Sequence, residues 1–178
     1  RLCGACAEAC VAGALEMVLP CDFIIASEDC QLGEPEVLFG AGPAFLIVPW
    51  LVGVHRAKDI LMTGRRFTGK EAADWGLITR AVPAAELDGA VVAQAEHLAK
   101  LPPPTLKLVK AGINRAYEVR GMQTSIDTWV DTALNLPQME TDEVREFRRR
   151  VREEGVKAAL KWRDAFYASA QKGGGQAP

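Results

Sequence analysis

The sequence predicts a protein of the α/β class, in which a first half with short strands is followed by a helical second half. Short apolar runs bounded by polar residues and turn signals occur at residues 21–27 and 77–82, a pattern typical of buried strands. From Ala84 onward, apolar residues recur at helical spacing instead. A length of 178 residues with 49% hydrophobic residues is sufficient for one domain with a sizeable core.

In the first half, helices and strands are expected to alternate. Helices are predicted at residues 13–19, 57–62 and 70–75, and strands at residues 21–27 and 77–82. An apolar loop or helix is expected from residue 37 onward. Proline cannot continue a helix or an inner strand and glycine favours turns, so four such residues mark the ends of these elements. They are Pro20, Gly64, Gly76 and Pro83.

The second half is predicted to be helical throughout. Its helices are expected at residues 87–101, 105–117, 125–136, 140–152 and 156–168. The run Pro102-Pro103-Pro104 separates the first two. Two or three short strands cannot form a stable sheet by themselves. We therefore expect the chain to be the later part of a domain, and Arg1 in place of methionine favours a processed chain or a fragment.

Composition and charge exclude several classes of partner. The net charge of −2 gives no reason to expect a nucleic acid or an anionic membrane. The longest apolar run, residues 41–54, is too short for a membrane span and contains Pro43 and Pro49. Soluble, cytoplasmic behaviour is therefore expected, without a membrane partner.

The five cysteines all lie within the first thirty residues, and their odd number and uneven spacing do not form a disulfide framework. This pattern favours a reducing compartment. Cys3, Cys6 and Cys10 are spaced closely enough to suggest an iron–sulfur cluster, but neither remaining cysteine lies at a customary spacing for a fourth ligand. We therefore interpret the cysteines as small buried residues and expect no metal.

Two carboxylates in the first half could support acid–base chemistry. Gly13 opens a predicted helix, where a backbone N–H favours developing negative charge. Glu16 lies one turn into that helix, and Glu36 follows a short predicted strand. Two carboxylates can hold a water between them and move its proton. Without further context, each is more often an ordinary surface residue.

A longer series of segments gives these residues a context. The segments are Ala12–Glu16, Cys21-Asp22, Ile25–Asp29, Leu32–Glu36, Leu51–Gly53, Leu61–Phe67, Lys70–Ile78 and Val82-Pro83. In this order and at these separations, they resemble the enoyl-CoA hydratase/isomerase (crotonase) superfamily. The resemblance covers residues 10–120 strongly and the helical remainder in outline.

The resemblance implies a fold and an assembly. Residues 1–83 would form part of a crotonase-like spiral ββα core with the catalytic site, without the N-terminal part of the family domain. Residues 84–178 would form a helical C-terminal region that packs subunits into a homotrimer or a hexamer. The family's first oxyanion donor lies in the earlier segment that this sequence does not contain.

The resemblance also implies site residues. Gly13 would supply an oxyanion-hole N–H, and Glu16 with Glu36 would be the catalytic pair around a water. Phe45 and Trp50 would form an acyl-pocket wall or core. Lys161 and Arg163 lie where relatives place basic residues near the phosphates of coenzyme A, although an ordinary exposed helix face is an equal alternative.

The implied activity is hydration of the 2,3 double bond of an acyl-CoA thioester. No cofactor is expected, because coenzyme A is part of the substrate. Having both glutamates favours hydration over double-bond migration. The apolar loop 39–45, shorter than in most relatives, keeps another chemistry open: an isomerase, a hydrolase or a decarboxylase. A non-catalytic truncated member is the third alternative.

Overall fold

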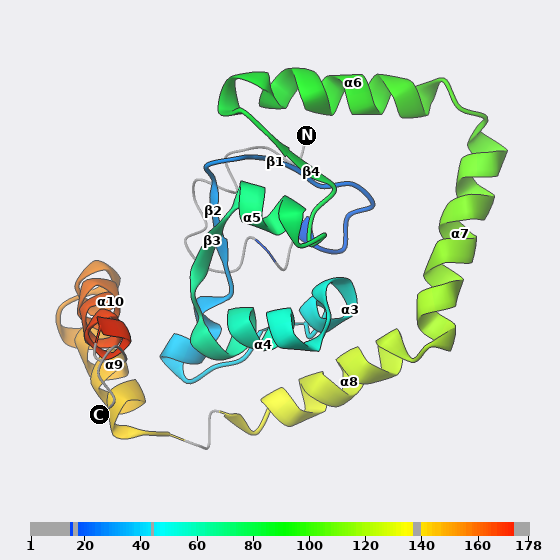
Figure 1. The fold of residues 1–178 in the computed structure, drawn as a ribbon. Helices are drawn as coiled ribbons and strands as arrows, with labels where there is room; N and C mark the ends of the chain where they lie inside the picture. Colours follow the sequence, from blue (N-terminus) through cyan, green and yellow to red (C-terminus); the bar gives the residue numbers. More distant parts are fainter. Residues whose placement is uncertain (1–14, 16–17, 44, 137–139, 173–178) are drawn as a thin grey trace, which may run out of the picture.

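The computed structural model describes residues 15, 18–43, 45–136 and 140–172, and its strands form two small sheets (Figure 1). Strand β1 (Ile25–Ser27) pairs in parallel with β4 (Arg80–Val82). Strand β2 (Gln31–Gly33) pairs with β3 (Arg66–Thr68) in antiparallel fashion. Two-stranded sheets are barely stable alone, so the helices packed on them must supply most of the stability.

Short helices connect the strands. The 3-10 helix η1 (Pro35–Phe39) follows β2, and α3 (Val48–Val52) and α4 (Val54–Thr63) come before β3. Helix α5 (Gly69–Asp74) lies between β3 and β4 and begins with a capping box. In this box the Thr68 hydroxyl accepts a hydrogen bond from the Glu71 N–H at 3.2 Å, and the Glu71 carboxylate accepts one from the Thr68 N–H at 2.7 Å. Both are N–H groups that the helix itself leaves unpaired.

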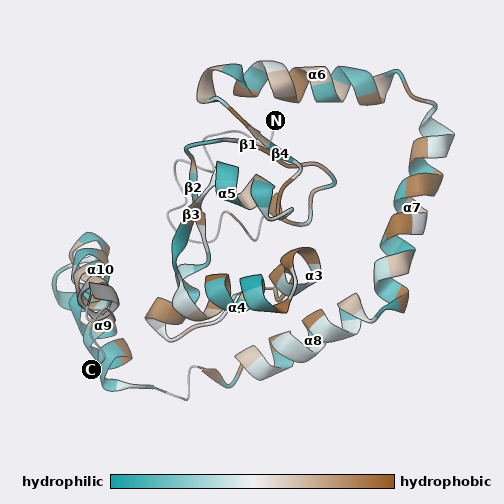
Figure 2. Cartoon of the chain, in the orientation of Figure 1, coloured by the Kyte–Doolittle hydropathy of each residue, from teal (hydrophilic) through white to brown (hydrophobic). Residues whose placement is uncertain are grey.

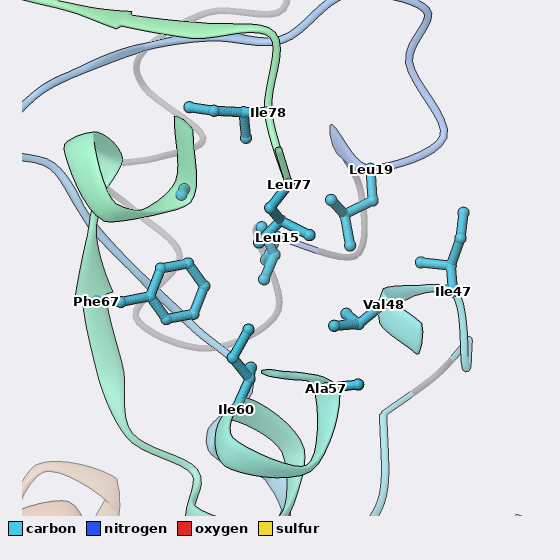
Figure 3. Close-up of a cluster of buried hydrophobic side chains, with 10 residues drawn as sticks. Leu15, Leu19, Ile47, Val48, Ala57, Ile60, Phe67, Leu77 and Ile78 are labelled. Atoms are coloured by element: carbon cyan, nitrogen blue, oxygen red, sulfur yellow. The ribbon is translucent and has the colours of Figure 1, made fainter. Parts of the chain in front are cut away.

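The apolar core lies between these helices and the two sheets (Figure 3). Ile60 and Phe67 are at most 1% exposed, and Trp75 covers the edge of the cluster with its ring centroid 5.0 Å from that of Phe67. The other buried members are Leu15, Leu19, Ile47, Val48, Ala57, Ala72, Leu77 and Ile78. Full burial of one large apolar side chain contributes about 1.5–3 kcal/mol, so this cluster is the main stabilising feature of residues 15–82.

Helices α6 (Leu87–Ala99), α7 (Pro103–Val119) and α8 (Met122–Ala133) follow the 3-10 helix η2 (Ala84–Glu86) and run around the core as an open arch (Figure 1). None of the side chains in these three helices is buried. Apolar and polar bands alternate along α7 (Figure 2), where four apolar side chains are exposed: Leu108, Val109, Ile113 and Val119. We call α6, α7 and α8 the arch.

The last two helices pack against each other as a hairpin. Helix α9 (Asp142–Glu153) begins at Thr141, whose hydroxyl accepts a hydrogen bond from the Val144 N–H at 3.4 Å. Helix α10 (Val156–Lys172) returns beside it (Figure 1). The Arg150 guanidinium lies over the Trp162 ring, 5.2 Å from its centroid. We call α9 and α10 the hairpin.

The predicted strands are shorter in the structure than in the sequence pattern. Only Ile25–Ser27 of residues 21–27 is a strand, because the stretch begins in a bend and Phe23 is 47% exposed. Only Arg80–Val82 of residues 77–82 is a strand. Leu77 and Ile78 instead pack into the core, where their N–H groups donate to the carbonyl of Ala72 at 2.9 and 3.4 Å.

The predicted helices are confirmed apart from shifts at their ends. Helix α8, for example, begins at Met122 rather than at residue 125, and α7 begins inside the proline run. The helix predicted at residues 13–19 lies largely outside the described residues, within which Leu15 and Val18 are helical. Helix α3 lies within the apolar segment for which the sequence leaves loop and helix open. The sequence pattern does not predict strands β2 and β3. No helix in the described ranges is long and apolar enough to cross a membrane.

Candidate active site

The Glu36 carboxylate lies at the start of η1, immediately after β2. Pro35 occupies the first turn of this helix, where a missing N–H costs nothing. One carboxylate oxygen of Glu36, Oε2, is buried and accepts no hydrogen bond within the described part of the chain. Buried polar atoms usually have a partner. Among the described residues, Oε2 of Glu36 therefore keeps its capacity to accept a hydrogen bond unused.

The backbone after Glu36 closes into a tight turn. The Ala41 N–H donates to the Glu36 carbonyl at 3.0 Å, and the Gly40 N–H donates to the Val37 carbonyl at 3.2 Å. Gly40 has φ +70°, a left-handed conformation in which only glycine is free of steric cost. The turn constrains the main chain that follows the carboxylate.

Glu34 is a second carboxylate in this segment, and sequence reasoning gave it no role. It is 1% exposed and lies two residues before Glu36. Burial of a glutamate is rare without partners, and no local pattern distinguishes it from the many exposed glutamates of the chain. The 3-10 helix η1, which begins at the next residue, packs against α4.

Two of the predicted site residues, Gly13 and Glu16, lie outside the described residues. Leu15 between them is described, is 1% exposed and belongs to the core cluster (Figure 3). The roles of Gly13 as oxyanion donor and of Glu16 as partner of Glu36 stay predictions.

The predicted substrate-binding residues differ in exposure. Phe45 is 47% exposed and Trp50 is half-buried, so neither belongs to the buried core cluster. On α10, Lys161 is exposed, whereas Arg163 is only 3% exposed and donates from Nε to the Asp164 carboxylate at 2.9 Å. Contacts of all four with a substrate stay predictions.

A cavity of about 560 Å³ lies at the N-terminal end of α4. Its lining residues are Val52, Gly53, Val54, His55, Arg56, Asp59 and Trp75. Arg56 donates to the Asp59 carboxylate at 3.0 Å and lies 4.3 Å from the centroid of the Trp75 ring. The 3-10 helix η1 packs near the opposite end of α4, where Leu38 adjoins Gly64. Of the predicted site residues that the structure describes, none lines this cavity.

The titratable groups of the described residues are the candidates for an alternative centre to Glu36. Within the described ranges, no three histidine, cysteine, aspartate or glutamate residues lie close enough together to hold a metal ion. Cys3, Cys6 and Cys10 lie outside those ranges. Burial raises the pKa of the Cys30 thiol, which makes a reactive thiolate less available. His55 and His97 are exposed.

Comparison with known proteins identifies the family. The model of the enoyl-CoA hydratase/isomerase family matches residues 4–160. The chain is similar to a short-chain-enoyl-CoA hydratase from Clostridioides difficile, with 33% identity over 70% of this chain and 79% of the relative. It is also similar to a probable enoyl-CoA hydratase from Rhizobium meliloti, with 34% identity over 60% of this chain and 43% of the relative.

The fold agrees with this result. An enoyl-CoA hydratase/isomerase from Xanthobacter autotrophicus superposes with a TM-score of 0.81 at 36% identity, over 86% of this chain and 58% of that structure. The chain thus spans about half the length of several relatives that it matches. The matching segments and the superposition establish a partial crotonase-type core with a helical C-terminal part. The chain belongs to the enoyl-CoA hydratase/isomerase family.

Proposed function

We propose that the protein is an enoyl-CoA hydratase, which adds water across the 2,3 double bond of an acyl-CoA thioester. The observation that carries this proposal is the Glu36 carboxylate, whose Oε2 is buried without a hydrogen-bond partner in the described ranges. Such an oxygen can accept a proton from a bound water. Family membership and the hydratase names of similar proteins support the proposal.

The proposed hydration uses one water molecule and returns every proton that it takes. The water oxygen bonds to the β-carbon as a glutamate removes one of its protons, and the π electrons move toward the thioester oxygen. A proton is then delivered to the α-carbon, which completes the hydrated product. Glu36 and Glu16 share the roles of base and acid, and the Gly13 N–H donates to the enolate oxygen. A donor of this kind contributes a factor of about 10² to 10³ in rate.

A substitution of Glu36 tests the proposal. In the full-length product of the natural gene, Glu36→Gln keeps the size of the side chain but removes its basicity. The kcat for hydration of a short linear enoyl-CoA should fall by about 10² to 10⁴, measured as loss of the conjugated thioester absorbance. Glu96→Gln, an exposed position on α6, is the matched control and should retain activity.

The corresponding change at the predicted partner distinguishes hydration from related chemistry. Glu16→Gln should abolish hydration but could leave a double-bond isomerase active. A Glu36→Gln protein that hydrates at the rate of the unchanged protein contradicts the assigned role of Glu36. If the protein without substitutions moves the double bond along the acyl chain but does not hydrate it, the isomerase alternative is favoured.

A further inference from the structure

The arch contacts the segment that contains Glu36. We call this segment, residues 34–43, the Glu36 loop. The indole Nε1–H of Trp129 in α8 donates a hydrogen bond to the Pro43 carbonyl at 2.8 Å. Trp129 is half-buried and Pro43 is buried. The bond joins residues 86 positions apart in the sequence. It therefore fixes the end of the loop relative to α8.

The loop and the helices also pack so closely that two glycines have no space for a side chain. A Cβ on Gly42 would overlap the Trp129 ring, at 2.8 Å from Cη2, and would lie 3.2 Å from Cδ1 of Leu136. A Cβ on Gly40 would overlap the side chain of Val144 at the start of α9. Close packing of this kind prevents the loop from moving toward the helices.

A short backbone path leads from these contacts to the carboxylate. The Ala41 N–H, next to Gly42, donates to the carbonyl of Glu36 itself at 3.0 Å. On the other side, the ring of Pro35 restricts the backbone at the start of η1. A displacement at Pro43 or Gly42 is thus transmitted to the main chain of Glu36 rather than absorbed by a flexible linker.

We propose that Trp129 is a positioning residue for Glu36, holding the Glu36 loop so that the carboxylate meets its water in the reactive geometry. The inference rests on the proposed hydratase function. It assigns a catalytic effect to a residue of the arch that needs no contact with substrate. Small displacements of reacting groups matter, because an error of about 1 Å can reduce a rate about 10²-fold.

The first test is Trp129→Phe in the full-length protein. Phenylalanine keeps an aromatic ring in α8 but removes the indole N–H, so the Pro43 carbonyl loses its donor. We expect kcat for a short linear enoyl-CoA to fall by roughly 10- to 100-fold, with KM changed by less than about threefold. Trp75→Phe, which changes the same residue type beside Phe67 and away from the loop, should leave kcat unchanged.

A double variant tests the contact itself. Gly42→Ala inserts a methyl group into the Trp129 ring and should also lower kcat. Phenylalanine lacks the outer indole atoms that this methyl group would meet. The kcat of the double variant, Trp129→Phe with Gly42→Ala, should therefore fall by a smaller factor than the product of the two single reductions in kcat. Multiplicative single effects contradict a direct contact and overturn the proposal.

Amide hydrogen exchange supplies a measurement that does not depend on activity. In Trp129→Phe, exchange of the Gly40 and Ala41 amides should quicken by about tenfold or more, while strand β1 exchanges as before. Unchanged exchange overturns the proposal, as does quicker exchange with a normal kcat. If the protein without substitutions hydrates no enoyl-CoA, both the proposed function and the role of Trp129 are overturned. If that protein is active and the Trp129→Phe variant has the same kcat, only the role of Trp129 is overturned.

Discussion

The core and the arch solve the burial of apolar side chains in different ways. Residues 15–82 contain one cluster of buried apolar side chains, in which Phe67 and Ile60 are almost inaccessible. The arch buries none of its side chains and exposes Leu108 to 74%. Helices gain most of their stability from packing an apolar face. The core is thus stabilised by its own contacts, whereas the arch presents apolar faces that another surface could cover.

Polar and apolar contacts join the two regions, and Met122 of α8 packs against the core cluster. Lys110 of α7 forms an ion pair with Asp22, and Arg80 donates to the Ala90 carbonyl of α6 at 3.1 Å. Both lie at exposed positions, where such pairs contribute little to stability. The Trp129 hydrogen bond is the part-buried exception. The arch thus contacts the core through Met122 and the Glu36 loop through Trp129.

The largest expected effect is in the core. Phe67→Ala removes the largest fully buried side chain in the described ranges and leaves a cavity against Trp75 and Ile60. The free energy of unfolding should fall by about 3–5 kcal/mol, measured by urea titration. Val119→Ala at the end of α7, where valine is 72% exposed, should change it by less than about 0.5 kcal/mol. Equal effects at both positions would remove the distinction between the two regions.

A smaller effect on folding, but a clear effect on assembly, is expected in the arch. The family resemblance predicts a homotrimer or hexamer, and we propose that a second copy of the chain covers α7. Ile113→Lys places a charge on its exposed apolar face and should weaken self-association about tenfold or more. The molar mass from light scattering should fall while the unfolding transition of the core stays in place. The control is Asn114→Lys, at the adjacent exposed position.

An unchanged molar mass in Ile113→Lys would contradict self-association through α7. A lower free energy of unfolding with an unchanged molar mass would instead show that Ile113 stabilises the single protomer. Either result would alter the comparison, because the arch would then resemble the core rather than a surface for assembly.

Local signals in the sequence were sufficient for most helices. The glycines that follow α4 and α5, Gly64 and Gly76, are recognisable because a helix end depends on only a few neighbouring residues. The role of Glu36 is predicted differently, from a long series of segments that resembles one family, and it stays a prediction. Strands of three residues, such as β2 and β3, are too short to show an alternating pattern.

Interactions between distant residues had no such signal. The burial of Glu34 and the contact of Trp129 with Pro43 depend on how η1, α4 and α8 meet in space. No pattern in the sequence around Trp129 predicts that it contacts Pro43, 86 residues earlier in the chain. The same holds for Arg163, whose burial in the hairpin was not expected from a charged helix.

The smallest expected effect concerns the hairpin, which is held by charges on its surface as well as by buried groups such as Val144 and Ala159. Glu146 accepts hydrogen bonds from Arg149 at 2.8 and 2.7 Å and from Arg150 at 2.8 Å. These bonds, chiefly that from Arg149, lower the pKa of Glu146 from 4.5 to about 2. The folded protein therefore keeps this carboxylate ionised in acid more readily than the unfolded chain does.

This pKa difference gives a direction for the pH dependence. Stabilisation by these ion pairs is fully present above about pH 4.5 and is lost as the pH falls toward 2. In Glu146→Gln, the thermal midpoint should fall less steeply over this range, by circular dichroism, because no carboxylate is left to protonate. The difference in thermal midpoint between the two proteins should shrink in 1 M salt, because the Debye screening length is then only about 3 Å. Parallel acid profiles would show that the charges contribute nothing, leaving burial to stabilise the hairpin as it does the core.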